Sequence, residues 1–151
     1  MEEGDVACIT DMEKVFYANS EDGGNAAAAA FNADIGAWDV SKVTIMSHMF
    51  AGAISFNADI GDWDVSSVTS MDWMFSYARA FNGAIDAWDV SKITSMNNMF
   101  NQATAFNAAI DAWDVSSVTT MSAMFDGATA FDQNLEWCVG TSVNTDDAFL
   151  D

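Results

Sequence analysis

Hydrophobic and polar positions along this chain follow one pattern that returns every 25 residues, without insertion or deletion, from Phe31 to Phe131. The unit from Phe56 to Ala80 is representative, and its apolar positions are Phe56, Ile60, Trp63, Val65, Val68, Met71, Met74 and Phe75. One unit cannot bury this set by itself, whereas stacked units can, because each copy covers the next. The pattern therefore predicts a solenoid of stacked coils with one continuous apolar core.

Each unit is predicted to contain a short extended piece followed by a short helix. The extended piece is expected near Ile35–Trp38 and at its repeats. The helix is expected after a threonine with a polar residue three positions later, which is the spacing of a capping box, as in Thr10 and Glu13. Apolar residues then follow at helical spacing, as at Met46 and Phe50. The pattern predicts an α/β repeat with a short parallel strand plus a short helix in each coil.

The array accounts for the chain as a single solenoid domain, residues 1–151. We interpret residues 1–30 as a partial repeat with an insertion, 31–130 as four full repeats, and 131–151 as a degraded repeat that closes the apolar end. Within the insertion, Ala26–Ala30 is interpreted as either a helical turn or a mobile loop.

Two polar rows recur with the same period, and we interpret both as structural. The first is predicted to be a buried ladder that satisfies backbone groups at a tight corner, and it consists of Asn32, Asn57, Asn82 and Asn107. In the second, a short carboxylate is expected to accept a backbone N–H two residues further on, and this row is Asp39, Asp64, Asp89 and Asp114. A calcium ladder is the alternative for the second row, although one acid per coil supplies few of the oxygen ligands that calcium requires.

The charge of the chain limits its partners. A net charge of −19, with only four basic residues, disfavours nucleic acid and anionic membranes, because their phosphates are repelled. No apolar run approaches the ~18 residues of a membrane span, and the opening residues MEEGDVACIT lack the features of a secretory signal. Cys8 and Cys138 fall in different terminal coils, which we expect to be too far apart for a disulfide.

The sequence offers no recognisable catalytic constellation, and we expect neither enzymatic activity nor a bound cofactor or metal. His48 is the only histidine, and it cannot be placed in a Ser-His-Asp or Cys-His arrangement. A hidden carboxylate pair stays open as an alternative, because glycosidases need only two acids. The tryptophans in phase with Phe and Met are interpreted as core rather than as a platform for sugars. Trp73 differs, because it takes the repeat position of His48, and it is predicted to be an exposed aromatic anchor.

A row of acids flanks the central isoleucine of each unit, and we call it the acidic strip. The acid precedes the isoleucine in the first two full units and follows it in the next two, so each coil keeps one acid on the face that we expect to be exposed. The strip consists of Asp34, Asp59, Asp62, Asp86 and Asp111. We predict that it binds a protein partner with a basic surface or loosely held divalent cations. The alternative is that these acids only keep an exposed sheet soluble.

The pattern F-N-x-x-I-x-x-W-D-V-S-x-V-T-x-M-x-x-M-F, as written in Phe56–Phe75, resembles the BspA-like family of repeat surface proteins, which are relatives of leucine-rich repeats. The resemblance covers nearly the whole chain. It implies a right-handed, leucine-rich-repeat-like solenoid with a parallel sheet along one face, and an extracellular or cell-surface location. Arrays of this family often end with Trp and Cys followed by a closing Cys. Cys138 fits the first cysteine and the second is missing, so the resemblance implies a truncated sequence and a free Cys138 thiol.

We expect a non-enzymatic protein-interaction or surface-recognition module. The alternative is an accessory structural subunit wedged into a larger protein assembly, because the ends of a solenoid expose apolar surface. A regular ice-binding or mineral-binding surface is a third interpretation. The predicted use of the threonines as helix caps disfavours it.

Overall fold

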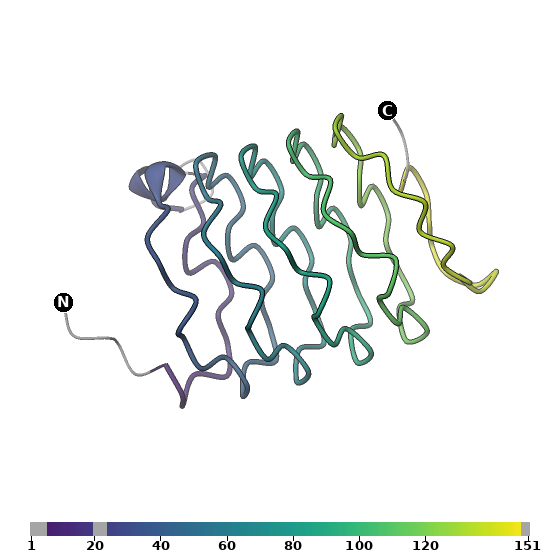
Figure 1. Ribbon diagram of the computed structural model, residues 1–151, viewed down its shortest axis with the longest axis horizontal. Helices are drawn as coiled ribbons and strands as arrows, with labels where there is room; N and C mark the ends of the chain where they lie inside the picture. The colour runs from purple at the N-terminus through teal and green to yellow at the C-terminus, as the bar shows by residue number, and fades with distance from the viewer. Residues whose placement is uncertain (1–5, 20–23, 149–151) are drawn as a thin grey trace.

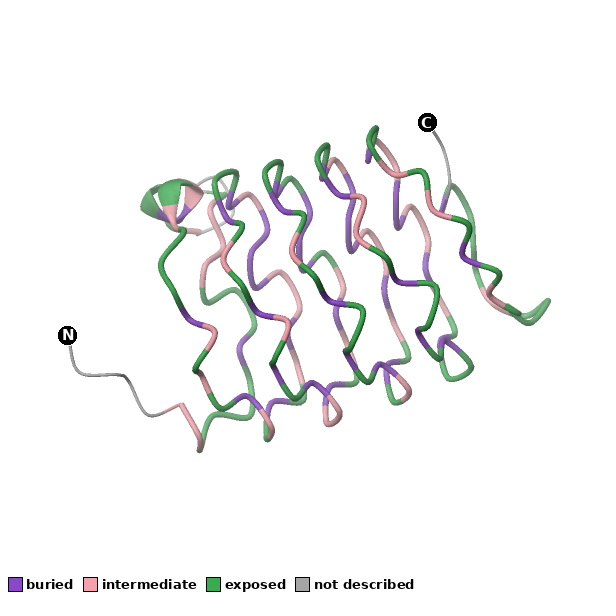
Figure 2. Cartoon of the chain, viewed as in Figure 1, coloured by how far each residue is buried: buried purple, intermediate pink, exposed green. Residues whose placement is uncertain are grey.

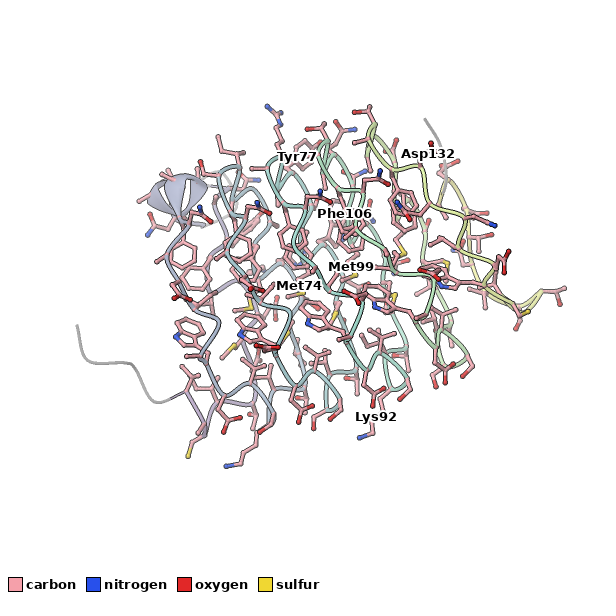
Figure 3. All side chains as sticks on the ribbon, viewed as in Figure 1. Met74, Tyr77, Lys92, Met99, Phe106 and Asp132 are labelled. Atoms are coloured by element: carbon pink, nitrogen blue, oxygen red, sulfur yellow. The ribbon has the colours of Figure 1, made fainter. Side chains whose placement is uncertain are left out.

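The structure is a computed structural model of the chain, and it describes residues 6–19 and 24–148. The backbone winds as a row of similar coils from the N-terminal end to the C-terminal end (Figure 1). Lys92 lies at the lower turns of the row and Tyr77 near the upper turns, and two segments of each coil connect these levels (Figure 3). Equivalent residues of neighbouring full units are 25 positions apart, as in the hydrogen bond between Thr69 and Thr44.

The predicted fold class is wrong in its secondary structure. Within residues 6–19 and 24–148, the only helix is η2, a 3-10 helix at Ala26–Ala30, and β-structure is confined to isolated parallel bridges. The bridges pair Asp11 with Ile45, Ile45 with Ser70, Ser70 with Ser95, Ser95 with Thr120, and Thr120 with Asn144. This part of the chain is therefore not an α/β solenoid with a strand and a helix per coil. It also lacks the parallel sheet that the leucine-rich-repeat resemblance implied.

The segment after each threonine forms successive turns instead of the predicted helix. The N–H groups of Met71 and Trp73 donate to the carbonyls of Ser95 and Asn97 on the next coil, whereas the N–H of Met74 donates to the Met71 carbonyl. Trp73 has a φ of 59°, a left-handed conformation that interrupts a right-handed helix. Alternate amides consequently bond to the neighbouring coil, and the hydrogen bonds of a helix do not form.

The threonines are not helix caps, which corrects the prediction made for them. The Thr69 hydroxyl donates to the carbonyl oxygen of Thr44 at 3.2 Å, and the Thr69 N–H donates to the same oxygen at 2.9 Å. Thr94 and Thr119 repeat both bonds with the threonine of the coil before them. The threonine column thus joins neighbouring coils.

Side chains rather than a backbone ladder hold the segment around the central isoleucine, where a strand was predicted. The Trp63 Nε1–H donates to the Ile35 carbonyl at 3.1 Å, and the Asn57 Oδ1 accepts the N–H of Asn82 at 2.8 Å. The asparagine row forms the predicted ladder, with equivalent bonds from Asn57 to Asn32 and from Asn107 to Asn82. Its first three members are exposed, so the prediction that the ladder is buried is wrong.

The apolar positions of the repeat form the predicted continuous core. Buried positions recur along both segments of the coils (Figure 2). Within a coil, Phe75 stacks on Phe81 with ring centroids 3.9 Å apart, and between coils it stacks on Phe50 at 5.6 Å and Phe100 at 5.7 Å. The interpretation of the tryptophans as core is confirmed for the three central members, Trp63, Trp88 and Trp113, which are 3–4% exposed.

The turns and termini agree with several of the remaining predictions. Each corner aspartate accepts the N–H of the serine two residues on, at 3.0–3.1 Å, in Asp39, Asp64, Asp89 and Asp114. The helical-turn interpretation of Ala26–Ala30 is confirmed by η2, in which the Asn25 side chain accepts the N–H of Ala27. Cys8 and Cys138 are both exposed free cysteines. No helix of the described residues is long and apolar enough to cross a membrane.

Candidate functional site

The acidic strip is exposed along its length. Asp34, Asp59, Asp62, Asp86 and Asp111 are all exposed residues, as predicted. Among the described residues, the only ion pair joins Lys14 to Glu13 at 3.4 Å, so no strip carboxylate is paired with a base in this part of the chain. The carboxylates therefore present their charge to solvent, although they lie on irregular coil segments and not on the predicted strands.

Three strip acids come together in one open depression of about 400 Å³. It is lined by Asn32, Asp34, Gly36, Ala37, Ala58, Asp59 and Asp62. The Oδ1 atoms of Asp34 and Asp59 accept the N–H groups of Gly36 and Gly61 at 3.1 Å, which fixes both carboxylates on tight turns. Asp86 and Asp111 lie outside this depression. Within residues 6–19 and 24–148, no group of three His, Cys, Asp or Glu is arranged to hold a metal ion.

A second depression, which we call the aromatic groove, surrounds Trp73 on different residues. It has a volume of about 540 Å³ and is lined by Tyr17, Ala18, Asn19, His48, Ala51, Gly52, Trp73, Ser76 and Tyr77. Trp73 is 37% exposed, which confirms its predicted exposure. Its ring stacks on His48 with centroids 5.9 Å apart and an angle of 7°, and the Tyr17 ring meets His48 edge-on at 5.8 Å.

Several residues that line the aromatic groove have a left-handed backbone conformation. The φ values are 58° at His48, 59° at Trp73 and 58° at Tyr77, and Gly52 also has a positive φ of 77°. This conformation costs an L residue about 1–2 kcal/mol relative to right-handed backbone. The hydrogen bonds between coils hold it in place, as in the bond from the Tyr77 N–H to the Asn101 carbonyl at 2.8 Å.

Two buried polar atoms of the groove residues make no hydrogen bond with the described part of the chain. They are the Ser76 Oγ, on a side chain that is 1% exposed, and the His48 Nδ1. Asn101 occupies the position equivalent to Ser76 on the next coil, but its amide nitrogen donates to Asp126 at 2.9 Å. Buried polar groups are normally paired, so these two atoms represent unused hydrogen-bonding capacity beside the groove.

Burial lowers the pKa of His48 below its ordinary value. The positive charge of Lys14 acts in the same direction, whereas Glu13 and Asp72 oppose the shift. His48 is therefore neutral at pH 7, and its ring is available as a neutral hydrogen-bonding group.

The lowered pKa of His48 predicts a pH-dependent loss of stability. As the pH falls below about 6.5, the unfolded chain takes up a proton that the folded chain resists, so the free energy of unfolding decreases. His48→Asn, which installs the residue found at the equivalent Asn98, is expected to remove this component. Urea midpoints of both proteins at pH 7.5, 6.5 and 5.5 test this prediction. Parallel pH profiles of the two proteins would contradict it.

The corner aspartates form a second acidic row, separate from the acidic strip, and they have a different role. Hydrogen bonds from the Ser41 hydroxyl, at 2.6 Å, and from the Ser41 N–H lower the pKa of Asp39. Asp64, Asp89 and Asp114 have lowered pKa values for the same reason. Their charge is thus used locally to stabilise the corners.

Sequence reasoning found Trp73 and missed its groove partners. The sequence only excludes His48 from the usual catalytic arrangements, and it does not single out Tyr17, Ser76 or Tyr77. One signal was available in the sequence. The repeat position of His48 and Trp73 is occupied by Asn98 and Ala123 in later coils, and that of Tyr77 by Gln102 and Gly127. Aromatic rings therefore occur at these two positions only in coils nearer the N-terminus. Tyr17 takes the repeat position of Ala51, which carries Ser76 and Asn101 in later coils, so the repeat pattern does not mark this position as aromatic.

These features define a class of protein. The chain is a tandem-repeat protein in which similar coils are joined by ladders of hydrogen bonds, and the side chains that line the aromatic groove occur in only some of the coils. It belongs to the family described as "Mycoplasma protein of unknown function, DUF285", which matches residues 1–87 and 80–151. Comparisons with curated proteins and with solved structures found no significant match.

Proposed function

We propose that this protein is a non-enzymatic recognition module that binds a basic surface of a protein partner through the acidic strip. The observation that carries the proposal is the exposure of the strip carboxylates without an ion pair among the described residues, with three of them around one depression. An unpaired row of like charge attracts a complementary surface and increases its association rate. The likeness of the repeat to BspA-like surface proteins supports an extracellular or cell-surface setting, where Trp73 would supply an additional contact.

The test replaces the strip acids with isosteric amides. The variant Asp34→Asn, Asp59→Asn, Asp86→Asn and Asp111→Asn retains the Oδ1 acceptors that the turns at Gly36 and Gly61 use. With a lysine-rich decapeptide as the probe, calorimetry at low salt is expected to give an affinity roughly tenfold weaker than that of the natural chain, because each exposed charge pair contributes about 0.2–1 kcal/mol. The difference should shrink as salt is added.

A matched control distinguishes the effect of the strip acids on binding from the effect of the total negative charge of the chain. The variant Glu13→Gln, Asp132→Asn, Glu136→Gln and Asp146→Asn removes the same number of charges from exposed positions outside the strip. It is expected to bind the decapeptide more tightly than the strip variant does. Equal affinities for the two variants would show that net charge alone is responsible, and unchanged binding in the strip variant would exclude the strip.

The C-terminal end of the array supports a second candidate function, an accessory subunit within a larger assembly. An open depression of about 730 Å³ lies there, and its apolar lining includes Phe125, Phe131, Leu135, Trp137 and Val139. Such a surface is typical of an interface with another protein. Light scattering on concentrated protein is the test, because self-association would support this function and a strict monomer would weaken it.

A further inference from the structure

The first and last coils of the row expose apolar side chains at positions that are buried everywhere else in the repeat. Val15 is 50% exposed, although its repeat position is fully buried in the later coils, where it is occupied by Met49, Met74, Met99 and Met124. Ile9 is exposed at the position of the fully buried Val43. At the other end, Val139 is exposed, whereas Val115, which also follows a tryptophan by two residues, is buried. Both ends therefore present core positions of the repeat to solvent.

The two ends present opposite faces of the same interface. They lie at opposite ends of the row (Figure 1). The Trp38 ring stacks on Trp63 with centroids 6.5 Å apart, and the Trp137 ring stacks on Trp113 at 6.3 Å, so each terminal ring is covered on the side that faces the array. Inside the row, one coil supplies the face that Trp137 leaves open and the next coil supplies the face that Trp38 leaves open.

Two rows of hydrogen bonds end with a donor at the N-terminal end and an acceptor at the C-terminal end. Each later tryptophan donates its Nε1–H to a carbonyl on the coil before it, which leaves the Trp38 Nε1–H and the Leu135 carbonyl over. In the asparagine ladder, each backbone N–H donates to the side-chain oxygen one coil earlier, which leaves the Asn32 N–H and the Asp132 carboxylate over. None of these four groups has a hydrogen-bond partner among the described residues.

The other segment of each coil ends in the complementary way. There the N–H of Trp73 donates to the Asn97 carbonyl on the next coil at 2.8 Å, and Asp147 has the same left-handed conformation as Trp73, with a φ of 56°. The Asp147 N–H at the C-terminal end and the Glu13 carbonyl at the N-terminal end make no hydrogen bond with the described part of the chain. One translation by a coil spacing therefore pairs the free groups of both segments at once.

From these matches we propose that the C-terminal end of one copy of this chain binds the N-terminal end of a second copy, head to tail, so that the aromatic columns and hydrogen-bond rows continue across the contact. A second copy is favoured as the occupant because its N-terminal end repeats the surface that covers each coil inside the row. It would cover the depression of about 730 Å³ at the C-terminal end. The proposal rests on the second candidate function above and names the neighbouring subunit. A contact of this kind does not close on itself, so it extends into open rows of copies.

Like charge gives the contact a characteristic salt dependence. Each copy has a net charge of −19, and acids lie at both ends, with Glu13 and Asp34 at one and Asp132 and Glu136 at the other. Salt screens their repulsion, so association between copies is expected to strengthen as salt is added. Binding of a basic partner to the acidic strip is expected to weaken under the same conditions. The sign of the salt effect therefore separates the two interactions.

Cross-linking tests the orientation of the contact. Two variants of the full chain have Cys8→Ser and Cys138→Ser, and one carries Ala37→Cys while the other carries Glu136→Cys. Both sites are exposed and directly precede the terminal tryptophans of the column. Neighbouring coils at ~4.8 Å bring equivalent positions within disulfide reach. Oxidation of the mixture in high salt is expected to give mainly the mixed dimer. Monomers only, or dimers that form equally well from either variant alone, would overturn the proposal, and the second outcome would still leave an assembly role.

Sedimentation at ~0.5 M salt tests the apolar contact. The average mass of the natural chain is expected to rise with concentration beyond that of a dimer. Val139→Asp is expected to weaken association roughly tenfold or more, because it buries an unpaired carboxylate in the contact. Tyr77→Asp places the same charge on an exposed apolar residue of a central coil and is expected to have no effect.

Equal association of the Val139→Asp and Tyr77→Asp variants, or a monomer at every salt concentration, would overturn the proposal. Both variants are expected to bind the lysine-rich decapeptide as the natural chain does, since neither changes a strip acid. Failure of head-to-tail contact with peptide binding intact would therefore leave the strip function standing, and loss of peptide binding in the fourfold strip variant would leave this contact unaffected.

Discussion

Replacing Phe75 with alanine is expected to remove about 3–5 kcal/mol from the free energy of unfolding. The side chain is fully buried, and its ring stacks on Phe50, Phe81 and Phe100, so its loss opens a cavity in three coils at once. Domains of this size are typically stable by about 5–15 kcal/mol, so the variant is expected to lose a large fraction of its stability. Urea denaturation followed by tryptophan fluorescence measures the change.

Ile54→Ala is the control for this substitution. Ile54 is also a large apolar residue, but it is 47% exposed, and its truncation is expected to change the free energy of unfolding by roughly 0.5 kcal/mol or less. A similar loss in both variants would mean that stability does not depend on the phenylalanine stack.

Gly61→Ala is expected to destabilise the protein by about 1–3 kcal/mol through overpacking between two coils. A Cβ atom at Gly61 would lie 2.6 Å from the Ala84 carbonyl oxygen, a backbone atom that cannot move without shifting its coil. The melting temperature and the urea midpoint should both decrease.

Gly140→Ala provides the matched comparison for the glycine substitution. A Cβ atom at Gly140 would have its nearest neighbour, the Ser142 hydroxyl oxygen, at 3.9 Å, which is an ordinary contact. This variant is expected to keep the stability of the natural chain. If Gly61→Ala were equally harmless, the coils would have to be more compliant than the close approach indicates.

The core could be predicted from the sequence because burial follows the period alone. Any stacked arrangement of the units places Phe75 and Met74 inside, whatever the backbone does between them. The secondary structure could not be predicted in this way. The residues after Thr69 have the spacing of a capped helix, but the left-handed conformation at Trp73 and Tyr77 prevents one, and residue type does not reveal it because non-glycine residues seldom adopt it.

For the candidate sites too, exposure could be predicted from the sequence, whereas the local backbone conformation could not. The strip acids were predicted to be exposed because they alternate with a buried isoleucine, and exposure requires no knowledge of strand geometry. The carboxylate turns at Asp34 and Asp59 were missed, because they depend on the local backbone. The aromatic groove was missed except for Trp73, because it depends on how side chains of neighbouring coils, such as Tyr17 and His48, come together, and the sequence period alone does not show this.

The ladders between coils have a mechanical consequence. The threonine and asparagine bonds connect each coil to the next, so a force that separates the two ends of the row acts equally on every inter-coil layer, and the layers rupture one after another. A released unit of 25 residues extends by up to roughly 80–90 Å as a straightened chain. Under tension the molecule would lengthen in equal steps and dissipate work at each one, as an extensible tether does.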